Sequence, residues 1–140
     1  MNRTASQTTD PNESNSLKLF MNAMRGENHH QRPPVWLMRQ AGRYLPEYRA
    51  IREKYSFKEM CNNAELAVEV SLLPHKIFDM DAIIVFYDIL IPLEAMGAPL
   101  SYTDKGPVFS EPIQDVKALE CLPTLEPETQ TVCLLETIKQ

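Results

Sequence analysis

Several features are scarce or missing in this sequence of 140 residues, and each absence narrows the function. The three cysteines are odd in number and show no Cys-x-x-Cys spacing, which disfavours a disulfide framework or a zinc site and favours reduced thiols. No apolar run is long enough to span a bilayer. The first sixteen residues contain no apolar stretch, so they do not fit a secretory signal. They carry two acidic residues and a single arginine, which argues against a transit peptide. We therefore expect a cytoplasmic protein that does not bind membranes.

Glycine is also scarce, and its distribution excludes one common class of site. The four glycines are scattered at Gly26, Gly42, Gly97 and Gly106, so nothing resembles a phosphate-binding loop. What the sequence does contain is 44% apolar and 24% charged residues, a composition typical of globular proteins. A chain of this length can bury a sizeable core in one domain.

Positive charge is in deficit overall, but it is unevenly distributed. The net charge is −5, yet residues 1–60 hold ten Lys/Arg against six Asp/Glu, and residues 61–140 hold four against thirteen. A nucleic-acid-binding domain would usually be basic over a whole face, so nucleic acid is not an expected partner. An anionic small molecule remains possible, but local arginines would have to bind it, since the overall field would not attract it.

The chain divides into a polar start and a patterned remainder. Residues 1–16 are rich in Ser, Thr and Asn and are interpreted as a disordered tail, with residues 17–140 as the folded part. Hydrophobic periodicity, capping residues and proline positions predict a series of helices. The predicted helices cover residues 17–24, with Gly26 as the stop, and residues 46–55, 89–96, 114–121 and 128–139. A short helix is also predicted after a capping box at Ser56. A longer one follows, capped by Asn62 or Asn63 and kinked or divided at Pro74.

Two apolar segments have the pattern of buried strands. Residues 35–38 and 81–88 are continuous apolar runs, typical of strands covered on both faces, with Trp36 and Phe86 in the core. Residues 100–102 and 107–109 predict a hairpin around residues 103–106. Strands alternating with helices predict an α/β fold with a parallel sheet or barrel. Only two parallel-type strands are present, so we interpret the sequence as the beginning of a larger domain.

Charged residues follow each of these two predicted strands. Arg39 and Arg43 come directly after the first, and Asp88 comes directly after the second, so the three would converge at one sheet edge. Guanidinium groups there could bind carboxylates. Simpler interpretations remain open, because Asp88 could cap a helix and the arginines could be solvated or pair with Glu47. No metal site is expected: His29 and His30 are adjacent, with no third ligand nearby.

At these residues the sequence resembles a known family. Residues 34–48, Pro-Val-Trp-Leu-Met-Arg-Gln-Ala-Gly-Arg-Tyr-Leu-Pro-Glu-Tyr, closely resemble the N-terminal signature of the uroporphyrinogen decarboxylase family. Residues 86–90, Phe-Tyr-Asp-Ile-Leu, are similar to its second motif, in which Ser stands in place of Tyr87. The similarity runs from about Leu17 to the end. Corrinoid-type barrel methyltransferases share the fold but not the arginine block, and they remain an alternative.

The resemblance implies a fold and an activity. It implies a (β/α)₈ TIM barrel, of which this chain would be the incomplete N-terminal part, and a homodimer that works without metal or organic cofactor. The family decarboxylates the four acetate side chains of uroporphyrinogen III, giving coproporphyrinogen III in tetrapyrrole and heme biosynthesis. A barrel needs roughly 250 residues, so we expect the isolated chain to be inactive. An alternative is a fragment that binds porphyrinogen or docks on a partner without catalysis.

The resemblance also implies roles for individual residues. Arg39 and Arg43 would bind substrate carboxylates, and Arg39 would assist proton transfer. Asp88 would accept hydrogen bonds from the pyrrole N–H groups and stabilise the cation formed when a pyrrole is protonated. The other expected substrate-binding residues shape the loop or line the apolar part of the cleft: Gln40, Ala41, Gly42, Phe86 and Ile89. On a strand, Tyr87 would point away from Asp88 and pack against a helix.

Overall fold

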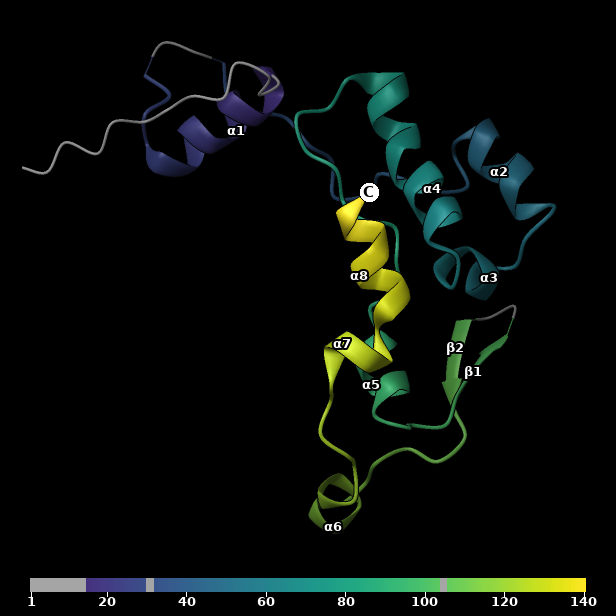
Figure 1. Ribbon diagram of the computed structural model, residues 1–140. Coiled ribbons are helices and arrows are strands. Elements are labelled where there is room, and N and C mark those ends of the chain that lie inside the picture. The colour runs from purple at the N-terminus through teal and green to yellow at the C-terminus, as the bar shows by residue number, and fades with distance from the viewer. Residues whose placement is uncertain (1–14, 30–31, 104–105) are drawn as a thin grey trace, which may run out of the picture. The chain divides into compact units, whose positions relative to one another are not determined.

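The computed structural model describes residues 15–29, 32–103 and 106–140 (Figure 1). The predicted disordered tail therefore lies almost wholly outside the described residues, as does His30. The chain divides into two compact units, each of which is described by itself. Unit 1 comprises the described residues up to Gln40 together with Pro74–Ile84, and unit 2 comprises Ala41–Leu73 and Val85–Gln140.

The described residues form helices and one small sheet, so the fold is mixed α/β. No helix among them is long and apolar enough to cross a membrane. In chain order the elements are α1 (Asn15–Arg25), α2 (Pro46–Arg52), α3 (Phe57–Cys61), α4 (Ala64–Phe78), α5 (Ile91–Ala95), β1 (Leu100–Thr103), β2 (Gly106–Phe109), α6 (Val116–Glu120), α7 (Pro127–Gln130) and α8 (Val132–Lys139).

Helix α1 of unit 1 ends where the sequence predicts. Gly26 follows Arg25 with a φ of 73°, a left-handed conformation that glycine adopts without steric cost. The amide of Glu27 then donates to the carbonyl of Asn22 at 2.9 Å, which satisfies one of the last free carbonyls of the helix.

The two predicted parallel strands are absent, which is the main correction to the sequence interpretation. Residues 35–38 and 81–88 are not strands, and within the described residues the sheet consists of β1 and β2 alone. Trp36, expected in the core, is 47% exposed, and Met38 is 84% exposed. A strand requires a ladder of backbone hydrogen bonds. Here a single backbone bond joins the two segments, from the Asp81 amide to the Val35 carbonyl at 2.9 Å.

The core of unit 2 forms where α2, α3 and the first part of α4 pack together. Its buried members are Leu45, Tyr48, Met60, Val70 and Leu73. Phe86, predicted to be a core residue, is partly buried and packs against this cluster. Its ring contacts those of Tyr48 and Phe57 edge to face, with centroids 5.8 and 5.6 Å away. Val70 and Leu73 of α4 therefore belong to this core, and the contacts of Phe86 with it fix the chain just before Asp88.

Local capping signals in unit 2 are confirmed. Ser56 and Glu59 form the predicted capping box at the start of α3, and Asn63 accepts from the Leu66 amide at 3.1 Å to cap α4. The predicted division of α4 at Pro74 is wrong, since the helix runs through Pro74 without interruption. Pro74 is fully buried, and its packing offsets the missing backbone donor.

The remainder of unit 2 follows the predicted order with shorter elements. β1 and β2 pair antiparallel, with Leu100 opposite Phe109, which confirms the hairpin; residues 104 and 105 lie outside the described residues. Pro92 sits in the first turn of α5 and so does not interrupt it, while the predicted helix over 128–139 breaks at Thr131 into α7 and α8. Figure 1 shows the hairpin next to α3, where Tyr102 and Phe57 have ring centroids 5.7 Å apart.

Candidate substrate-binding groove

An open groove of about 1030 Å³ lies in unit 2, and several of the predicted site residues line it. Its walls come from the loop before α2, the start of α3, the turn before α5 and the hairpin. The lining comprises the cationic side chains Arg43, Arg52 and Lys58, the carboxylate of Asp88, and a mixture of aromatic, apolar and small residues that includes Tyr48, Phe57, Ile89, Leu90, Leu100 and Tyr102.

Asp88 is not the N-cap of α5, which is Leu90 and has no side-chain cap, but its two carboxylate oxygens differ in their surroundings. Its Oδ1 accepts a hydrogen bond from the Leu90 amide at 3.0 Å, so the carboxylate does stabilise the turn that leads into α5. Its Oδ2 is buried and has no hydrogen-bond partner among the described residues. Buried carboxylate oxygens are rarely left in this state. One oxygen is therefore used by the fold, and the other is left without a partner among the described residues.

Arg43 lies on the groove with its guanidinium exposed and unpaired by any described carboxylate. The predicted alternative pairing with Glu47 does not occur in the described part of the chain. The backbone beneath Arg43 is fixed instead, because Arg49 Nη1 donates to the Arg43 carbonyl at 2.8 Å. The free guanidinium can therefore bind a carboxylate of a ligand.

Gln40 and Arg39 belong to unit 1. The Gln40 side chain is buried and bonds to the backbone of the extended segment 81–88. Its Nε2 donates to the Ala82 carbonyl at 2.9 Å, and its Oε1 accepts from the Ile84 amide at 2.8 Å. Gln40 thus stabilises the backbone rather than presenting its amide to a ligand. Arg39 is exposed, and its predicted convergence with Asp88 stays a prediction because each unit is described by itself.

The other predicted loop residues have modest roles. Ala41 packs against the core of unit 2, and Gly42 accepts a turn hydrogen bond from the Leu45 amide at 3.0 Å. Gly42 does not use a positive φ, and a Cβ there would meet the Tyr44 ring at an ordinary distance of 3.5 Å. Ile89 is 91% exposed and lines the groove, and its predicted contact with a ligand stays a prediction.

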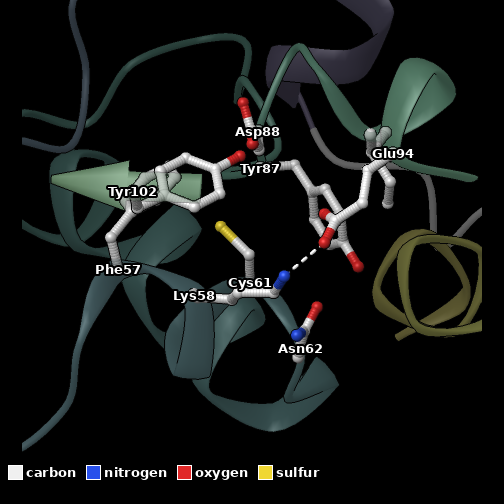
Figure 2. Close-up of a pocket in the computed structure, with 9 residues that line it drawn as sticks. Phe57, Lys58, Cys61, Asn62, Tyr87, Asp88, Glu94 and Tyr102 are labelled. Atoms are coloured by element: carbon white, nitrogen blue, oxygen red, sulfur yellow. Dashed lines mark hydrogen bonds and ion pairs between the residues drawn. The ribbon is translucent and has the colours of Figure 1, made fainter. Parts of the chain in front are cut away.

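Tyr87 and Cys61 line a small cavity together with Asp88 (Figure 2). Burial raises the pKa of Tyr87, and a hydrogen bond with Cys133 of α8 raises it further, so this tyrosine packs against a helix as predicted. Burial also raises the pKa of Cys61 to about 12, with the nearby Asp88 charge adding to the effect. Both groups are therefore neutral at physiological pH.

The groove also contains residues that sequence reasoning missed. Arg52 follows Leu45 and Tyr48 at helical spacing, and this pattern could have placed it on the same face of α2. Lys58 forms an ion pair with Glu94, and its Nζ lies 6.0 Å from the centroid of the Tyr102 ring. Glu94 is 36 residues further along the chain, so no local pattern could have revealed this pair.

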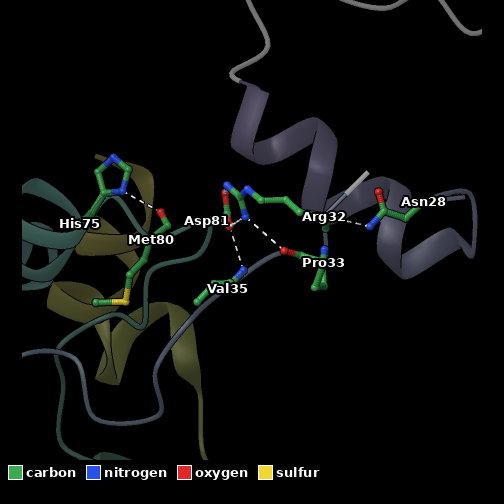
Figure 3. Close-up of polar contacts among 7 residues, drawn as sticks. All are labelled: Asn28, Arg32, Pro33, Val35, His75, Met80 and Asp81. Carbon is green, nitrogen blue, oxygen red and sulfur yellow. Dashed lines mark hydrogen bonds and ion pairs between the residues drawn. The ribbon is translucent and has the colours of Figure 1, made fainter. Parts of the chain in front are cut away.

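A second polar cluster, in unit 1, was also missed (Figure 3). Asp81, whose side chain is 1% exposed, binds Arg32 through both oxygens, at 2.5 and 2.8 Å, and accepts from the Val35 amide at 2.8 Å. The hydrogen bond with Asp81 raises the pKa of Arg32. This cluster holds the two extended segments together. As for metals, no group of three potential ligands occurs in the described ranges.

These features define a class of protein: a mixed α/β chain with a groove lined by arginine, lysine and the partly buried carboxylate of Asp88. The model of the uroporphyrinogen decarboxylase (URO-D) family matches residues 15–140, and the chain belongs to this family.

Curated relatives agree with this assignment. The chain is 55% identical over 111 residues to the uroporphyrinogen decarboxylase of Francisella tularensis subsp. novicida, covering 78% of this chain and 32% of the relative. It is 49% identical over 110 residues to that of Gloeobacter violaceus, covering 78% and 31%, and 50% identical over 121 residues to that of Desulfotalea psychrophila, covering 86% and 35%. The chain therefore spans about a third of the length of these relatives.

Proposed function

We propose that this chain supplies the N-terminal third of a uroporphyrinogen decarboxylase, which converts uroporphyrinogen III to coproporphyrinogen III. The observation that carries the proposal is the groove in unit 2, where the free Oδ2 of Asp88 and the unpaired guanidinium of Arg43 line one cavity. Family membership and relatives with this name support the activity. They also favour it over a barrel methyltransferase.

The chemistry of the substrate suits these groups. Uroporphyrinogen carries eight carboxylates on its rim and four pyrrole N–H groups directed inward. Arg43 and Arg52 can bind rim carboxylates through planar, bidentate hydrogen bonds. Asp88 Oδ2 can accept hydrogen bonds from the inner N–H groups. The volume of about 1030 Å³ lies at the upper end of the usual range for small-molecule sites.

Decarboxylation of an acetate side chain needs an electron sink. Protonation of the adjacent pyrrole supplies one: the electron pair of the breaking C–C bond neutralises the ring cation as carbon dioxide leaves. A second proton then completes the methyl group, and the first proton leaves the ring to restore the neutral pyrrole. A carboxylate held near the ring stabilises the cation electrostatically, and we assign this role to Asp88. Arg39 would assist proton transfer, and no metal or organic cofactor enters the proposed reaction.

The proposal includes the barrel of which the extended segments would form strands. Residues 35–38 and 81–88 expose Val35, Trp36, Ile83 and Ile84, side chains that a barrel would cover. In this proposal the two segments become parallel strands when neighbouring strands supply the missing hydrogen bonds, and the assembled enzyme is a cytoplasmic homodimer. The isolated chain, with these surfaces uncovered, would not decarboxylate its substrate.

The experiment is a complementation assay. The purified chain is incubated with uroporphyrinogen III under reducing, anaerobic conditions, alone and with the complementary two thirds of a relative, and coproporphyrinogen is measured by chromatography. We expect product only in the mixture, and none when the chain carries Asp88→Ala. Product from the isolated chain would contradict its proposed inactivity. A complemented mixture that retains full activity with Asp88→Ala would contradict the assigned role.

A second candidate function is binding of porphyrinogen without catalysis. It is favoured by the location of Arg43, Arg52, Lys58 and Asp88, which all line the groove of unit 2. This candidate predicts saturable binding of the macrocycle by the chain alone and no product in any complemented mixture. Product formation in the mixture would exclude it.

A further inference from the structure

Two buried oxygen atoms without partners lie beside the same small cavity in unit 2. Asp88 Oδ2 and the hydroxyl of Tyr102 are both inaccessible to solvent, and neither has a hydrogen-bond partner among the described residues. Both residues line a cavity of about 10 Å³ between α3, the turn before α5 and β1. Figure 2 shows the Tyr102 hydroxyl directed toward Asp88.

Contacts elsewhere fix both groups in place. The Tyr102 ring packs on Phe57, with centroids 5.7 Å apart, and lies 6.0 Å from Lys58 Nζ, so its hydroxyl cannot easily turn to solvent. Oδ1 of Asp88 is held by the Leu90 amide at 3.0 Å, which leaves Oδ2 directed away from that turn. The two unpartnered atoms are thus a consequence of the packing of the fold.

The cavity has the size and lining of a site for one water molecule. A volume of about 10 Å³ corresponds to roughly one water-sized sphere, and buried waters typically bridge polar groups that would otherwise lack partners. A tyrosine hydroxyl donates one hydrogen bond and an ionised carboxylate only accepts, so the two groups are complementary across a bridging water.

Other polar groups around the cavity are already engaged or are poor donors. Lys58 is paired with Glu94, and the Tyr87 hydroxyl interacts with Cys133. Cys61 keeps its proton, because burial raises its pKa to about 12, and a thiol is a weak donor. Asn62 is exposed and can be satisfied by solvent. Tyr102 is therefore the strong donor that remains for Asp88.

We propose that Tyr102 is a positioning residue for Asp88: its hydroxyl donates a hydrogen bond, relayed by one water in this cavity, to Oδ2. The relay fixes the carboxylate, whose residue lines both this cavity and the groove, and occupies one lone pair of Oδ2. This inference rests on the proposed function, because the ligand that Asp88 would then meet is the inward N–H group of a porphyrinogen.

The test compares two hydroxyl deletions by calorimetric titration of uroporphyrinogen III into the 140-residue chain. Tyr102→Phe keeps the ring contact and removes the donor, while Tyr87→Phe removes a hydroxyl from the same cavity lining as a matched control. We expect Tyr102→Phe to weaken binding about tenfold, and Tyr87→Phe to change it less than twofold. In an Asp88→Asn background, Tyr102→Phe should have no further effect. An equal loss in both backgrounds would overturn the proposal, because Tyr102 would then contact the ligand itself.

Two spectroscopic readouts keep this inference separate from the proposed function. The infrared carboxylate band of Asp88, identified by ¹³C labelling and loss on Asp88→Asn, should shift in Tyr102→Phe and not in Tyr87→Phe. The wild-type chain should also show a long-lived water nuclear Overhauser effect to the Tyr102 ring protons, which does not depend on any variant folding. Absence of either signal would overturn the relay. If both signals are present but no chain binds the macrocycle, the relay stands and the proposed function fails.

Discussion

Apolar segments are buried in unit 2 but exposed in unit 1. In unit 2 the apolar side chains Val70 and Leu73 of α4 pack with residues of α2 and α3, and Met60 in this core is 0% exposed. In unit 1 the run that ends at Met38 is equally apolar, yet Met38 is 84% exposed. The difference teaches that an apolar pattern gives a segment the capacity to be buried, while burial itself depends on a surface that covers it.

Unit 1 is instead held together by polar side chains. Asp81 bridges Arg32 and the Val35 amide, and Gln40 bridges the backbone of Ala82 and Ile84. These contacts align the two extended segments without a ladder. Unit 1 should therefore be sensitive to loss of a few hydrogen bonds, and unit 2 to loss of buried volume.

The largest expected effect comes from a matched pair of methionines. Met60→Ala removes a fully buried side chain from unit 2 and should lower the free energy of unfolding by about 3 kcal/mol, since it leaves a cavity. Met38→Ala removes an exposed side chain from unit 1 and should change that free energy by less than about 0.5 kcal/mol. Urea unfolding followed by circular dichroism measures both. Equal losses would show that the apolar segment of unit 1 is buried after all.

The next effect should come from the polar anchor of unit 1. Asp81→Asn removes the charge that binds Arg32 and one acceptor of the cluster, and it should cost about 2 kcal/mol. Trp36, the only tryptophan of the chain, lies between the Asp81 contact at Val35 and Gln40, so its fluorescence reports on unit 1. Glu27→Gln, an exposed change in the same unit, is the control. An unchanged unfolding midpoint of Trp36 fluorescence in Asp81→Asn would contradict the anchoring role.

A smaller effect is expected at the capping box of α3. Ser56→Ala removes the acceptor for the Glu59 amide and should cost about 1 kcal/mol. Thr129→Ala removes a hydroxyl that donates to the exposed carbonyl of Glu126 just before α7; it should cost less and serves as the comparison. Thermal unfolding provides the measurement, and identical midpoints for wild type and Ser56→Ala would show that the cap does not stabilise unit 2.

The smallest expected effect is a pH dependence of stability, which should come from the same capping box. Hydrogen bonds from Ser56 lower the pKa of Glu59 below its ordinary value of 4.5. A carboxyl whose pKa is lower in the folded state stabilises the fold above its unfolded pKa, and this contribution is lost as the pH falls through the folded pKa. The stability difference between wild type and Glu59→Gln should therefore shrink as the pH is lowered below about 4.5. A difference that grows with acid would have the wrong sign for this account.

Local signals allowed much of unit 2 to be predicted from the sequence. The capping box at Ser56, the cap at Asn63 and the hairpin all depend on neighbouring residues, and all are confirmed. The parallel strands were wrong because strand formation depends on partners far along the chain, and the described residues supply one backbone bond between the two segments.

The candidate site divides in the same way. Arg43 and Asp88 were predicted from their positions after apolar runs, and Ile89 was predicted from the family resemblance; the structure places all three on the groove. The ion pair of Lys58 with Glu94 and the shared cavity of Tyr102 and Asp88 join distant parts of the chain, so no local sequence pattern indicates them. Arg39 remains a prediction because it belongs to unit 1.

The central claim is that the groove of unit 2 binds a macrocyclic polycarboxylate through Asp88. The most direct measurement is calorimetric titration of uroporphyrinogen III into the wild-type chain, Asp88→Ala and Asp115→Ala. Asp115 is the N-cap of α6, where its Oδ1 accepts from the Ala118 amide at 2.7 Å, and it does not line the groove. We predict saturable binding to wild type and Asp115→Ala, and at least about tenfold weaker binding to Asp88→Ala. Equal affinity of all three chains, or no binding to any, would contradict the claim.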